Sequence, residues 1–379
     1  MIPEIFLKVV LLHDWLTGYR GGERVLEAFC EMFPEAPLYT LIHKPGSVPA
    51  IIENRKIVTS FLNRVPAIDE HYRKFLPLFP LAAQSLRITE DAEIVLSSSH
   101  CVIKGVRKPA NAKHFCYIHS PMRYMYDQFP FYFGKECPLY QRSAAHLLRP
   151  LLQAWDRSSN QNVDLFCANS EFVKERVHQF YNRDAMVIHP FVELEDFLPR
   201  QLDPPAKEDF YLMVTAFAPN KRVDLAIDAF NRSGKQLKII GSGQQEKQLR
   251  AMAGTSIEFL GNLSRDEVID HYFRARGFIF PGIEDFGITP LESLAAGTPL
   301  IAYHKGGVLE TQTEQTAHFF YQQTVEALEQ AITEFENRVF FKEVLLERAR
   351  EFSRESFKER VREAISGLLT TSTCANNAQ

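Results

Sequence analysis

The chain has 379 residues, of which 45% are hydrophobic and 24% are charged, and its formal net charge is -4. This length favours two domains over one, and the composition excludes an extensively disordered chain. The small negative charge excludes a general attraction to nucleic acid or to an anionic membrane, so no nucleic-acid partner is expected and membrane contact requires a local basic patch.

The N-terminal residues are apolar, but they predict a first strand and not an export signal or a membrane span. They carry Glu4 and Lys8, lack a small-residue cleavage site and are too short to cross a bilayer. No later stretch reaches the roughly 18 uninterrupted apolar residues that a membrane helix needs. We therefore expect a cytoplasmic protein.

Short apolar runs rich in β-branched residues alternate with longer amphipathic stretches, a pattern that predicts βαβ units and parallel sheets. The strands predicted in the first half cover residues 8–14, 93–99, 113–119 and 164–170. Those predicted in the second half cover residues 209–216, 236–243, 256–262, 277–282 and 299–307. The fold class is therefore α/β, with two doubly wound, Rossmann-like domains in succession.

The domain boundary is expected within residues 190–210, which contain four prolines and many acids and show no periodicity. A linker there leaves a cleft between the two sheets. The predicted division is 1–192 for an acceptor-binding domain and 193–352 for a nucleotide-sugar-binding domain. A helix over 353–370 is expected to cross back to the first domain, and residues 371–379 are interpreted as a frayed tail.

The turn after the predicted strand 277–282 holds Glu284 and Gly287, and a helix is expected to follow from Pro290. This turn lies at the carboxyl end of a parallel strand, where ligands bind in open α/β sheets. Gly287 lets the backbone approach a ligand closely. The first N–H groups of the helix offer an anion site that suits a diphosphate.

Two separated carboxylates accompany this anion site. Glu284 in the loop and Glu292 in the helix can accept hydrogen bonds from two sets of hydroxyls, which suits a sugar and a ribose. The alternative is that both glutamates are solvated and that Gly287 only caps a turn, because acidic residues are mostly exposed. The spacing by itself leaves both interpretations open.

The sequence EDFGITPLESLAAGTPLIAYHKGG (284–307) closely resembles the Glu-x7-Glu signature of family-4 retaining glycosyltransferases, also called glycosyltransferase group 1. That family has the GT-B fold, in which two Rossmann-like domains face each other across a cleft. The resemblance implies that Glu284 holds sugar hydroxyls and Glu292 holds ribose hydroxyls. The donor-binding residues that it implies in this segment are Glu284, Asp285, Phe286, Gly287, Ile288 and Glu292.

The sequence TAFAPNKRVDLAIDAF (215–230) resembles the segment that follows the first strand of the family's second domain, and the family's phosphate-binding lysine falls on Lys221. Lys221 and Arg222 follow a predicted strand and precede a helix, a suitable place for cations that face a diphosphate. A solvated pair of loop residues is the alternative. Many relatives carry an arginine five residues before the lysine, where this chain has Ala216, and Arg222 is hypothesised to replace it.

In the first domain, HDWLTGYRGGERVLEAF (13–29) resembles the family's first strand, glycine-rich loop and helix. Gly21 and Gly22 are expected to precede that helix, with N–H groups that can face a phosphate or an acceptor hydroxyl. In CYIHSPMRYMYD (116–127), His119 ends a predicted strand and falls on the family histidine that lies beside the transferred sugar. Without that resemblance, a lone histidine is more often structural.

The resemblance implies transfer of a hexose to an acceptor hydroxyl with retained configuration, with no cofactor and no metal ion. We expect His119 and Glu284 to be catalytic, and Lys221, Arg222 and backbone N–H groups to stabilise the leaving diphosphate. No Asp-x-Asp motif or His/Asp cluster typical of a Mg²⁺ or Mn²⁺ site is present in the sequence.

The donor and the acceptor are inferred from the kind of relative that the chain resembles. Its motifs look most like those of bacterial mannosyltransferases that build O-antigen or exopolysaccharide. This resemblance implies GDP-mannose as the donor and a glycan or lipid-linked glycan as the acceptor, in the synthesis of lipopolysaccharide or another cell-surface polysaccharide.

Residues 64–87 mix basic and apolar side chains, and residues 104–113 add further positive charge. Such a stretch can sit on an anionic membrane near a lipid-linked acceptor, which would make the N-terminal domain a peripheral contact with the inner face of the membrane. A core-facing helix with a basic outer side explains residues 64–87 equally well.

Three other functions are alternatives. A transferase of the same fold could use a UDP-sugar carrying glucose, galactose or N-acetylglucosamine. A nucleotide-sugar epimerase or dehydrogenase needs a G-x-G-x-x-G after the first strand and an acid about 20 residues further on, and residues 13–25 lack that spacing. A non-catalytic carbohydrate-binding protein could keep the cleft without the reaction, but the intact set of Glu284, Glu292, Lys221 and His119 argues against it.

Overall fold

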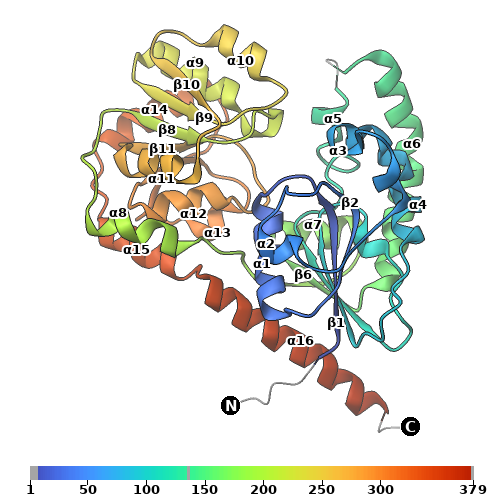
Figure 1. Cartoon of the computed structure of the whole chain (residues 1–379). Helices are drawn as coiled ribbons and strands as arrows, with labels where there is room; N and C mark the ends of the chain where they lie inside the picture. The colour runs from blue at the N-terminus through green and yellow to red at the C-terminus, as the bar shows by residue number, and fades with distance from the viewer. Residues whose placement is uncertain (1–6, 135–136, 377–379) are drawn as a thin grey trace. The chain divides into compact units, whose positions relative to one another are not determined.

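The computed structural model describes residues 7–134 and 137–376, with side chains described as far as residue 370 (Figure 1). The chain divides into two compact units. Unit 1 comprises Met1–Ile188 and Lys358–Gln379, and unit 2 comprises His189–Phe357. The division falls four residues before the boundary expected after residue 192.

In the described part of unit 1, seven parallel strands form one sheet in the order β3-β2-β1-β4-β5-β6-β7. The strands are β1 (Val9–Leu16), β2 (Leu38–His43), β3 (Ile57–Thr59), β4 (Ile94–Ser99), β5 (Lys113–Ile118), β6 (Leu165–Ala168) and β7 (Ala185–Val187). The helices are α1 (Gly21–Met32), α2 (Ala50–Glu53), η1 (Phe61–Arg64), α3 (Ile68–His71), η2 (Tyr72–Leu78), α4 (Phe79–Ser85), η3 (Ile103–Gly105), α5 (Phe129–Tyr132), α6 (Leu139–Ser159), η4 (Asn160–Asn162) and α7 (Glu171–Tyr181).

The predicted strands of the first half are confirmed as β1, β4, β5 and β6. Prediction missed β2, β3 and β7. Strands β3 and β7 are edge strands of three residues, too short to show a period of two, and the apolar run of β2 is interrupted by Thr40 and His43. The order is that of a Rossmann fold, in which the sheet grows in opposite directions from the adjacent strands β1 and β4.

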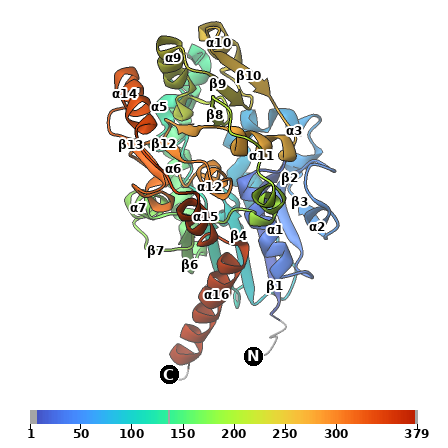
Figure 2. The ribbon, with the colours of Figure 1, turned by 90° about the vertical axis from the view of Figure 1, so that its left-hand side faces the viewer.

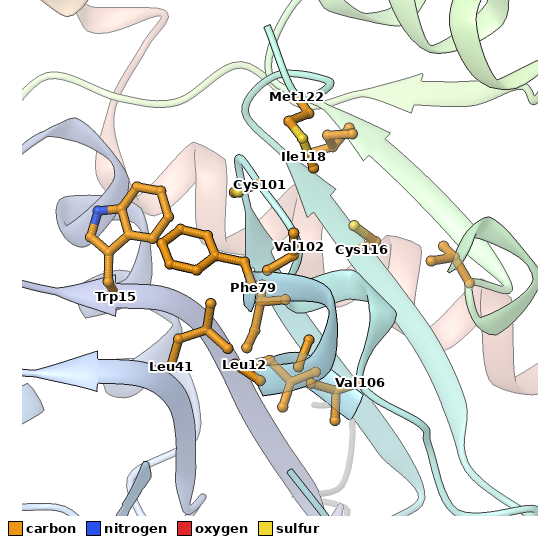
Figure 3. Close-up of a cluster of buried hydrophobic side chains, with 14 of the residues drawn as sticks. Leu12, Trp15, Leu41, Phe79, Cys101, Val102, Val106, Cys116, Ile118 and Met122 are labelled. Atoms are coloured by element: carbon orange, nitrogen blue, oxygen red, sulfur yellow. The ribbon is translucent and has the colours of Figure 1, made fainter. Parts of the chain in front are cut away.

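One core of unit 1 lies on the face of this sheet that α4 covers (Figure 3). Leu12 of β1 and Leu41 of β2 are fully buried there together with Phe79 of α4. The ring of Trp15 lies with its centroid 5.8 Å from that of Phe79. The strands are buried on both faces because helices cover each face of the parallel sheet.

The stretch 64–87 packs mainly into this core. Pro77 interrupts its helical pattern, so the stretch folds into the short elements α3, η2 and α4, which bury Tyr72 and Phe79 while Leu78 and Leu81 stay exposed. The core-facing interpretation therefore holds for most of its apolar side chains. Among the described residues, no helix is long and apolar enough to cross a membrane.

The sequence suggested that residues 104–113 add positive charge to the surface. Lys104 does not. Its side chain is buried, and Nζ donates to Asp156 Oδ1 at 2.7 Å and to Ser159 Oγ at 2.6 Å. The hydroxyls of Tyr126 and Tyr181 donate to the other oxygen of Asp156. A buried ammonium requires a paired carboxylate, so this lysine is a structural ion of the core.

The described residues of unit 2 contain a sheet of six parallel strands in the order β10-β9-β8-β11-β12-β13. The strands are β8 (Tyr211–Val214), β9 (Leu237–Ile240), β10 (Ile257–Gly261), β11 (Gly277–Phe280), β12 (Leu300–Tyr303) and β13 (Ala317–Phe320). The helices are η5 (Leu194–Phe197), α8 (Leu198–Leu202), η6 (Pro219–Lys221), α9 (Val223–Ser233), α10 (Glu246–Met252), α11 (Arg265–Arg274), α12 (Ile288–Ala295), α13 (Val308–Thr311), α14 (Val325–Glu336) and α15 (Lys342–Arg350). The five predicted strands are confirmed as β8 to β12, whereas the four-residue edge strand β13 was missed.

Unit 2 has three layers (Figures 1 and 2). Alternate strand residues enter two separate cores: Met213 and Ile239 pack with α9, α10 and α14, whereas Leu212 and Phe278 pack with α11, α12 and α15. This alternation is the period of two of a β-strand with both faces buried. The result is a second Rossmann-like, doubly wound sheet.

The C-terminal helix is longer than the sequence suggested. Helix α16 (Arg354–Asn376) begins one residue after the expected start at 353 and continues through six residues of the segment interpreted as a tail. These residues include no glycine or proline, so nothing in the local sequence ends the helix there. Residues 377–379 lie outside the described part of the chain.

Candidate functional site

Unit 2 places two loops side by side at its topological switch point, where β8 and β11 are neighbours and their connections lead to opposite sides of the sheet. The N–H of Ile283 donates to the carbonyl of Asn220 at 3.1 Å. A Cβ on Gly282 would lie 2.6 Å from that carbonyl oxygen and 2.7 Å from Lys221 Cα. Glycine at 282 thus allows the loop after β11 to contact the loop after β8.

This contact brings Lys221 and Glu284 together. Lys221 Nζ lies 2.5 Å from Glu284 Oε1, and the two side chains are 17% and 19% exposed. The sequence indicated both residues separately but gave no sign of the pair. The half-buried ion pair places a cation and a carboxylate together at the topological switch point. A ligand bound there contacts both charges.

The backbone that follows Glu284 is set by glycines. Gly287 has φ +91°, a left-handed conformation that favours glycine, and α12 begins at the next residue, Ile288, two residues earlier than predicted. The N–H of Gly307 donates to the carbonyl of Glu284 at 3.0 Å, and this hydrogen bond holds the loop after β11 against the segment after β12. The first-turn N–H groups of α12 have no acceptor within their own helix, as at any helix start.

Glu292 is buried, and this excludes the interpretation that it is a solvated surface acid. It is 4% exposed, and its carboxylate accepts from Arg265 Nη1 at 2.5 Å and from the Tyr272 hydroxyl at 3.2 Å. Arg265 also donates to Asp196 at 3.0 Å. Arg265 and Tyr272 could not be predicted as partners of Glu292, because they come from α11 and no local spacing connects them to it.

The residues between Glu284 and Glu292 that were predicted to bind the donor differ in how far their side chains are exposed. Phe286 is 3% exposed, and its ring stacks on that of His189 with centroids 5.7 Å apart, so its side chain belongs to the core. Asp285 is also buried and Ile288 is half-buried. The expectation that backbone N–H groups of Phe286 and Gly287 face a diphosphate stays a prediction.

Arg222 is paired with Asp224, two residues further along the chain. Its backbone is left-handed, with φ +52°, and its Nε donates to both carboxylate oxygens of Asp224 at 3.1 and 3.2 Å. Ala216 is exposed and contributes no cation. The hypothesis that Arg222 replaces the arginine missing at 216 stays a prediction, and it requires the guanidinium to leave or share Asp224.

Unit 1 also gathers polar residues at its switch point, between β1 and β4. Gly21 and Gly22 are the first two residues of α1 and do not precede it, which corrects the expectation from the sequence. The helix begins there because the Glu23 carboxylate accepts the N–H of Arg20 at 3.0 Å. A Cβ on Gly22 would lie 3.7 Å from a ring carbon of His13 and 3.8 Å from His119 Nε2.

His119 directly follows β5 and belongs to a chain of hydrogen bonds. Its Nε2 lies 2.8 Å from Ser98 Oγ, and Ser98 Oγ lies 3.1 Å from His13 Nδ1. His13 Nε2 in turn lies 3.7 Å from Glu23 Oε1, and Ser98, His13 and Glu23 are all nearly or fully buried. His119 is therefore not a lone histidine, and buried neighbours hold its ring in place.

The charges in this part of unit 1 are set by His13 and burial. Burial alone would raise the pKa of Glu23, but the adjacent His13 ring holds that pKa below its ordinary value. Burial, followed by the nearby His13, lowers the pKa of His100 to about 3, so His100 is neutral at physiological pH. His13, Ser98 and His100 were not predicted as site residues; their signal was polar residues within or directly after two adjacent buried strands.

The predicted site residues thus form two groups. Lys221, Glu284 and Gly287 lie together in unit 2, with Glu292 further along α12, and Gly22 lies beside His119 in unit 1. Within residues 7–134 and 137–376, no group of three His, Cys, Asp or Glu side chains could hold a metal ion. Metal independence of a reaction stays a prediction.

Two Rossmann-like units in one chain, each with polar residues at its switch point, define the GT-B class of fold. Residues 19–196 match the model of the Glycosyltransferase Family 4 domain, and residues 195–358 match the model of the Glycosyl transferases group 1 domain. The chain belongs to the glycosyltransferases that combine these two domains, which confirms the resemblance seen in the sequence.

Curated relatives match over part of the chain. An uncharacterized glycosyltransferase of Methanocaldococcus jannaschii is 28% identical over 200 residues, which cover 51% of this chain and 56% of the relative. The O-antigen chain mannosyltransferase RfbU of Salmonella typhimurium is 26% identical over 188 residues, which cover 44% of this chain and 52% of the relative. The chain spans about half the length of these relatives.

Solved structures match over nearly the whole chain. Sucrose-phosphate synthase from Thermosynechococcus elongatus superposes with a TM-score of 0.72 at 18% identity, covering 96% of this chain and 100% of that one. Anabaena HepE in complex with UDP superposes with a TM-score of 0.67 at 12% identity, covering 95% and 100%. At such identities the likeness shows the fold alone.

Proposed function

We propose that the protein is a retaining hexosyltransferase that moves mannose from GDP-mannose to a hydroxyl of a glycan or lipid-linked glycan, in the synthesis of a cell-surface polysaccharide. The observation that carries the proposal is the Lys221–Glu284 pair beside the start of α12. A cation and first-turn N–H groups suit a diphosphate, and the adjacent carboxylate suits sugar hydroxyls.

In this proposal, the two groups of residues serve one reaction. Lys221 and the backbone N–H groups at Phe286 and Gly287 stabilise the charge that develops on the leaving diphosphate, where preorganised donors have their largest effect. Glu292 binds ribose hydroxyls, and Arg265 orients its carboxylate through the 2.5 Å contact. His119, held by Ser98, orients the sugar or the acceptor.

Retention is proposed to proceed by attack of the acceptor on the face that the diphosphate leaves. Retaining glycosidases use a carboxylate nucleophile. Glu284 is engaged by Lys221 at 2.5 Å, which suits a hydroxyl-binding role for this carboxylate. Mass spectrometry of enzyme incubated with donor alone should find no glycosyl-enzyme adduct, and an adduct on Glu284 would overturn this part of the proposal.

The donor is tested with a panel of purified nucleotide sugars and a soluble acceptor, with and without EDTA. GDP-mannose is expected to be hydrolysed or transferred at an unchanged rate in EDTA. Support for this donor comes from the similarity to RfbU, whose name gives it as an O-antigen chain mannosyltransferase. Loss of activity in EDTA would end the proposal of a metal-independent reaction.

A UDP-sugar is the second candidate donor. It is favoured by the structural likeness to HepE, which was solved in complex with UDP. Turnover of UDP-glucose without turnover of GDP-mannose would replace the first candidate by the second. Conversion of the sugar without transfer to any acceptor would instead indicate a nucleotide-sugar-modifying enzyme.

A further inference from the structure

His100 lies beside His119 in unit 1, at the same edge of the sheet. It directly follows β4, as His119 directly follows β5, and the residues before them, Ser99 and Ile118, are paired in the sheet. The two imidazole rings have their centroids 6.3 Å apart, and the His13 ring lies 5.8 Å from that of His100. The His100 side chain is 23% exposed, so a ligand bound at this edge can contact it.

The backbone that carries His100 is held by the carboxylate of Asp14. Asp14 lies in β1 and is fully buried, and its Oδ2 accepts the N–H groups of His100 at 2.7 Å and Cys101 at 2.9 Å. Its Oδ1 accepts the N–H groups of Val102 at 2.8 Å and Ile103 at 2.9 Å. Burial raises the pKa of Asp14, and these N–H groups oppose that shift because they stabilise the charged form. One carboxylate therefore fixes the whole turn after β4.

The same carboxylate orients the His100 ring. Its Nδ1 lies 3.5 Å from Asp14 Oδ2, and the ring meets that of Trp15 at 88° with centroids 4.4 Å apart. A carboxylate beside Nδ1 favours the tautomer that carries the proton on Nδ1, which leaves the lone pair of Nε2 as an acceptor. Among the described residues, none forms a hydrogen bond with either ring nitrogen of His100. Because Nδ1 is directed at a buried group, Nε2 is the nitrogen that a ligand can contact.

The surroundings of His100 also exclude a role as a general base. Burial, followed by His13, lowers the pKa of the ring to about 3; Glu23 opposes this shift, and Arg123 and Arg20 add to it. A group with so low a pKa does not take the proton of a hydroxyl at neutral pH. As a neutral imidazole it still accepts a hydrogen bond from one.

We propose that His100 binds the acceptor of the transfer, with Nε2 accepting a hydrogen bond from a hydroxyl next to the reacting one, and that Asp14 is the residue that positions it. Because this role concerns the acceptor, it rests on the function proposed above. It makes His100 a residue that selects the acceptor, beside His119 and in the same unit.

The choice of a neighbouring hydroxyl follows from where the proton goes. In the proposed transfer, the bond from the anomeric carbon to the acceptor oxygen forms as the bond from that carbon to the diphosphate breaks. The proton of the reacting hydroxyl passes to the leaving diphosphate, since the His100 ring does not take it. The hydroxyl that donates to Nε2 is therefore a second one, so the acceptor carries at least two hydroxyls close together, as a sugar does.

The first test measures transfer from the donor to octyl glycosides of mannose, glucose and galactose. His100→Phe keeps a ring beside Trp15 but removes both nitrogens, and it should raise the KM for the best glycoside by roughly threefold to tenfold, the value of one hydrogen bond. Calorimetric titration with GDP should give the affinity of the unchanged chain, because GDP is proposed to bind in unit 2. His178→Phe, at an exposed histidine of α7, is the matched control and should leave the KM unchanged.

Monodeoxy analogues of the best glycoside identify the bound hydroxyl. Apart from the analogue that lacks the reacting hydroxyl, one should be a poorer acceptor for the unchanged chain by the same roughly threefold to tenfold. His100→Phe should not distinguish this analogue from the parent glycoside, because the partner of the missing hydroxyl is already gone. His100→Gln, whose amide reaches about as far as Nε2, should restore part of the discrimination.

The role of Asp14 is tested through the tautomer of His100. Nuclear magnetic resonance of the chain with isotope-labelled histidine, assigned with His100→Phe, should show a neutral ring with its proton on Nδ1 at neutral pH. Asp14→Asn should move part of the proton to Nε2 and raise the KM for the glycoside. A purely structural Asp14 would lower the melting temperature and leave the tautomer unchanged. If Asp14→Asn does not fold, the tautomer in the unchanged chain decides.

Three outcomes overturn the inference. They are an unchanged KM in folded His100→Phe, a proton on Nε2 of His100 in the unchanged chain, and transfer to none of the glycosides by a chain that hydrolyses the donor. The first two leave the proposed transfer standing. A chain that turns over no nucleotide sugar overturns the proposed transfer, and the inference with it.

Discussion

The two units use the same strand order but place different chemistry at the same topological position. Within β1 and β4, unit 1 has His13 and Ser98, which connect to His119 by hydrogen bonds. After β8 and β11, unit 2 has the ion pair of Lys221 and Glu284. The shared topology decides where a ligand can be held, and the side chains decide which kind of ligand that is.

This difference separates two tasks. A cation at a half-buried position interacts strongly with a diphosphate, because the local dielectric is lower than that of water. A histidine and a serine that exchange hydrogen bonds suit neutral hydroxyls of a sugar or an acceptor. The comparison is tested by replacing single side chains in each unit and measuring whether nucleotide binding, turnover or stability changes.

The largest effect is expected at the ion pair of unit 2. Lys221→Ala should lower turnover of the donor by on the order of a hundredfold to a thousandfold, the usual loss when a donor to a developing oxyanion is removed. Steady-state kinetics with GDP-mannose measure it. Lys235→Ala is the matched control, since Lys235 pairs with Glu336 at 2.8 Å elsewhere in unit 2. A loss of equal size in the control would contradict the role of Lys221.

The next effect is expected on nucleotide affinity. Glu292→Gln should weaken binding of the nucleoside diphosphate by about tenfold to a hundredfold, because charge-assisted hydrogen bonds to two ribose hydroxyls are lost. Calorimetric titration measures it. Asp196→Asn is the control, because it changes the other carboxylate that contacts Arg265 and leaves Glu292 in place. Unchanged affinity in Glu292→Gln would show that the carboxylate only holds α11 to α12.

The third prediction concerns the pH dependence of stability, which a buried histidine of unit 1 should produce. Burial lowers the pKa of His114 in unit 1 to about 4. Between that value and its unfolded pKa of about 6.5, the unfolded chain binds a proton that the folded chain does not. The free energy of unfolding should therefore fall as the pH drops below about 6.5, by up to roughly 1.4 kcal/mol per pH unit for this histidine. Denaturant melts at several pH values measure the slope, and His114→Gln should reduce it. Equal slopes would contradict a neutral buried His114.

The smallest effect is expected at the hydrogen-bond chain of unit 1. Ser98→Ala should lower kcat by roughly twofold to tenfold, the value of one hydrogen bond that positions His119. Ser97→Ala is a closely matched control: Ser97 is the adjacent residue of β4, and its hydroxyl bonds His114 at 2.8 Å in place of His119. A larger loss in Ser97→Ala than in Ser98→Ala would remove His119 from the reaction.

Much of the fold could be predicted because its signals are local. Buried parallel strands such as β6, β8 and β11 are short continuous apolar runs, which stand out in any sequence. The role of Gly287 in the loop was predictable for the same reason, because a left-handed conformation is a property of the residue's own backbone and favours glycine. Edge strands of three or four residues carry too few side chains for such a signal.

Partners distant in the sequence could not be predicted. Arg265 and Glu292 are 27 residues apart, and Lys104 and Asp156 are 52 apart, so neither pair has a spacing that a helix or a strand would produce. Lys104 was interpreted as surface charge because lysine is almost always exposed, and only the packed core shows its carboxylate partner.

The sequence by itself determined two parallel α/β domains and the segments that end their strands, because those properties depend on local periodicity and on backbone conformation. Only the tertiary structure decided that Lys221 meets Glu284 and that His119 is held through Ser98. Burial and pairing depend on which elements pack together, and long-range packing has no local signature in the chain.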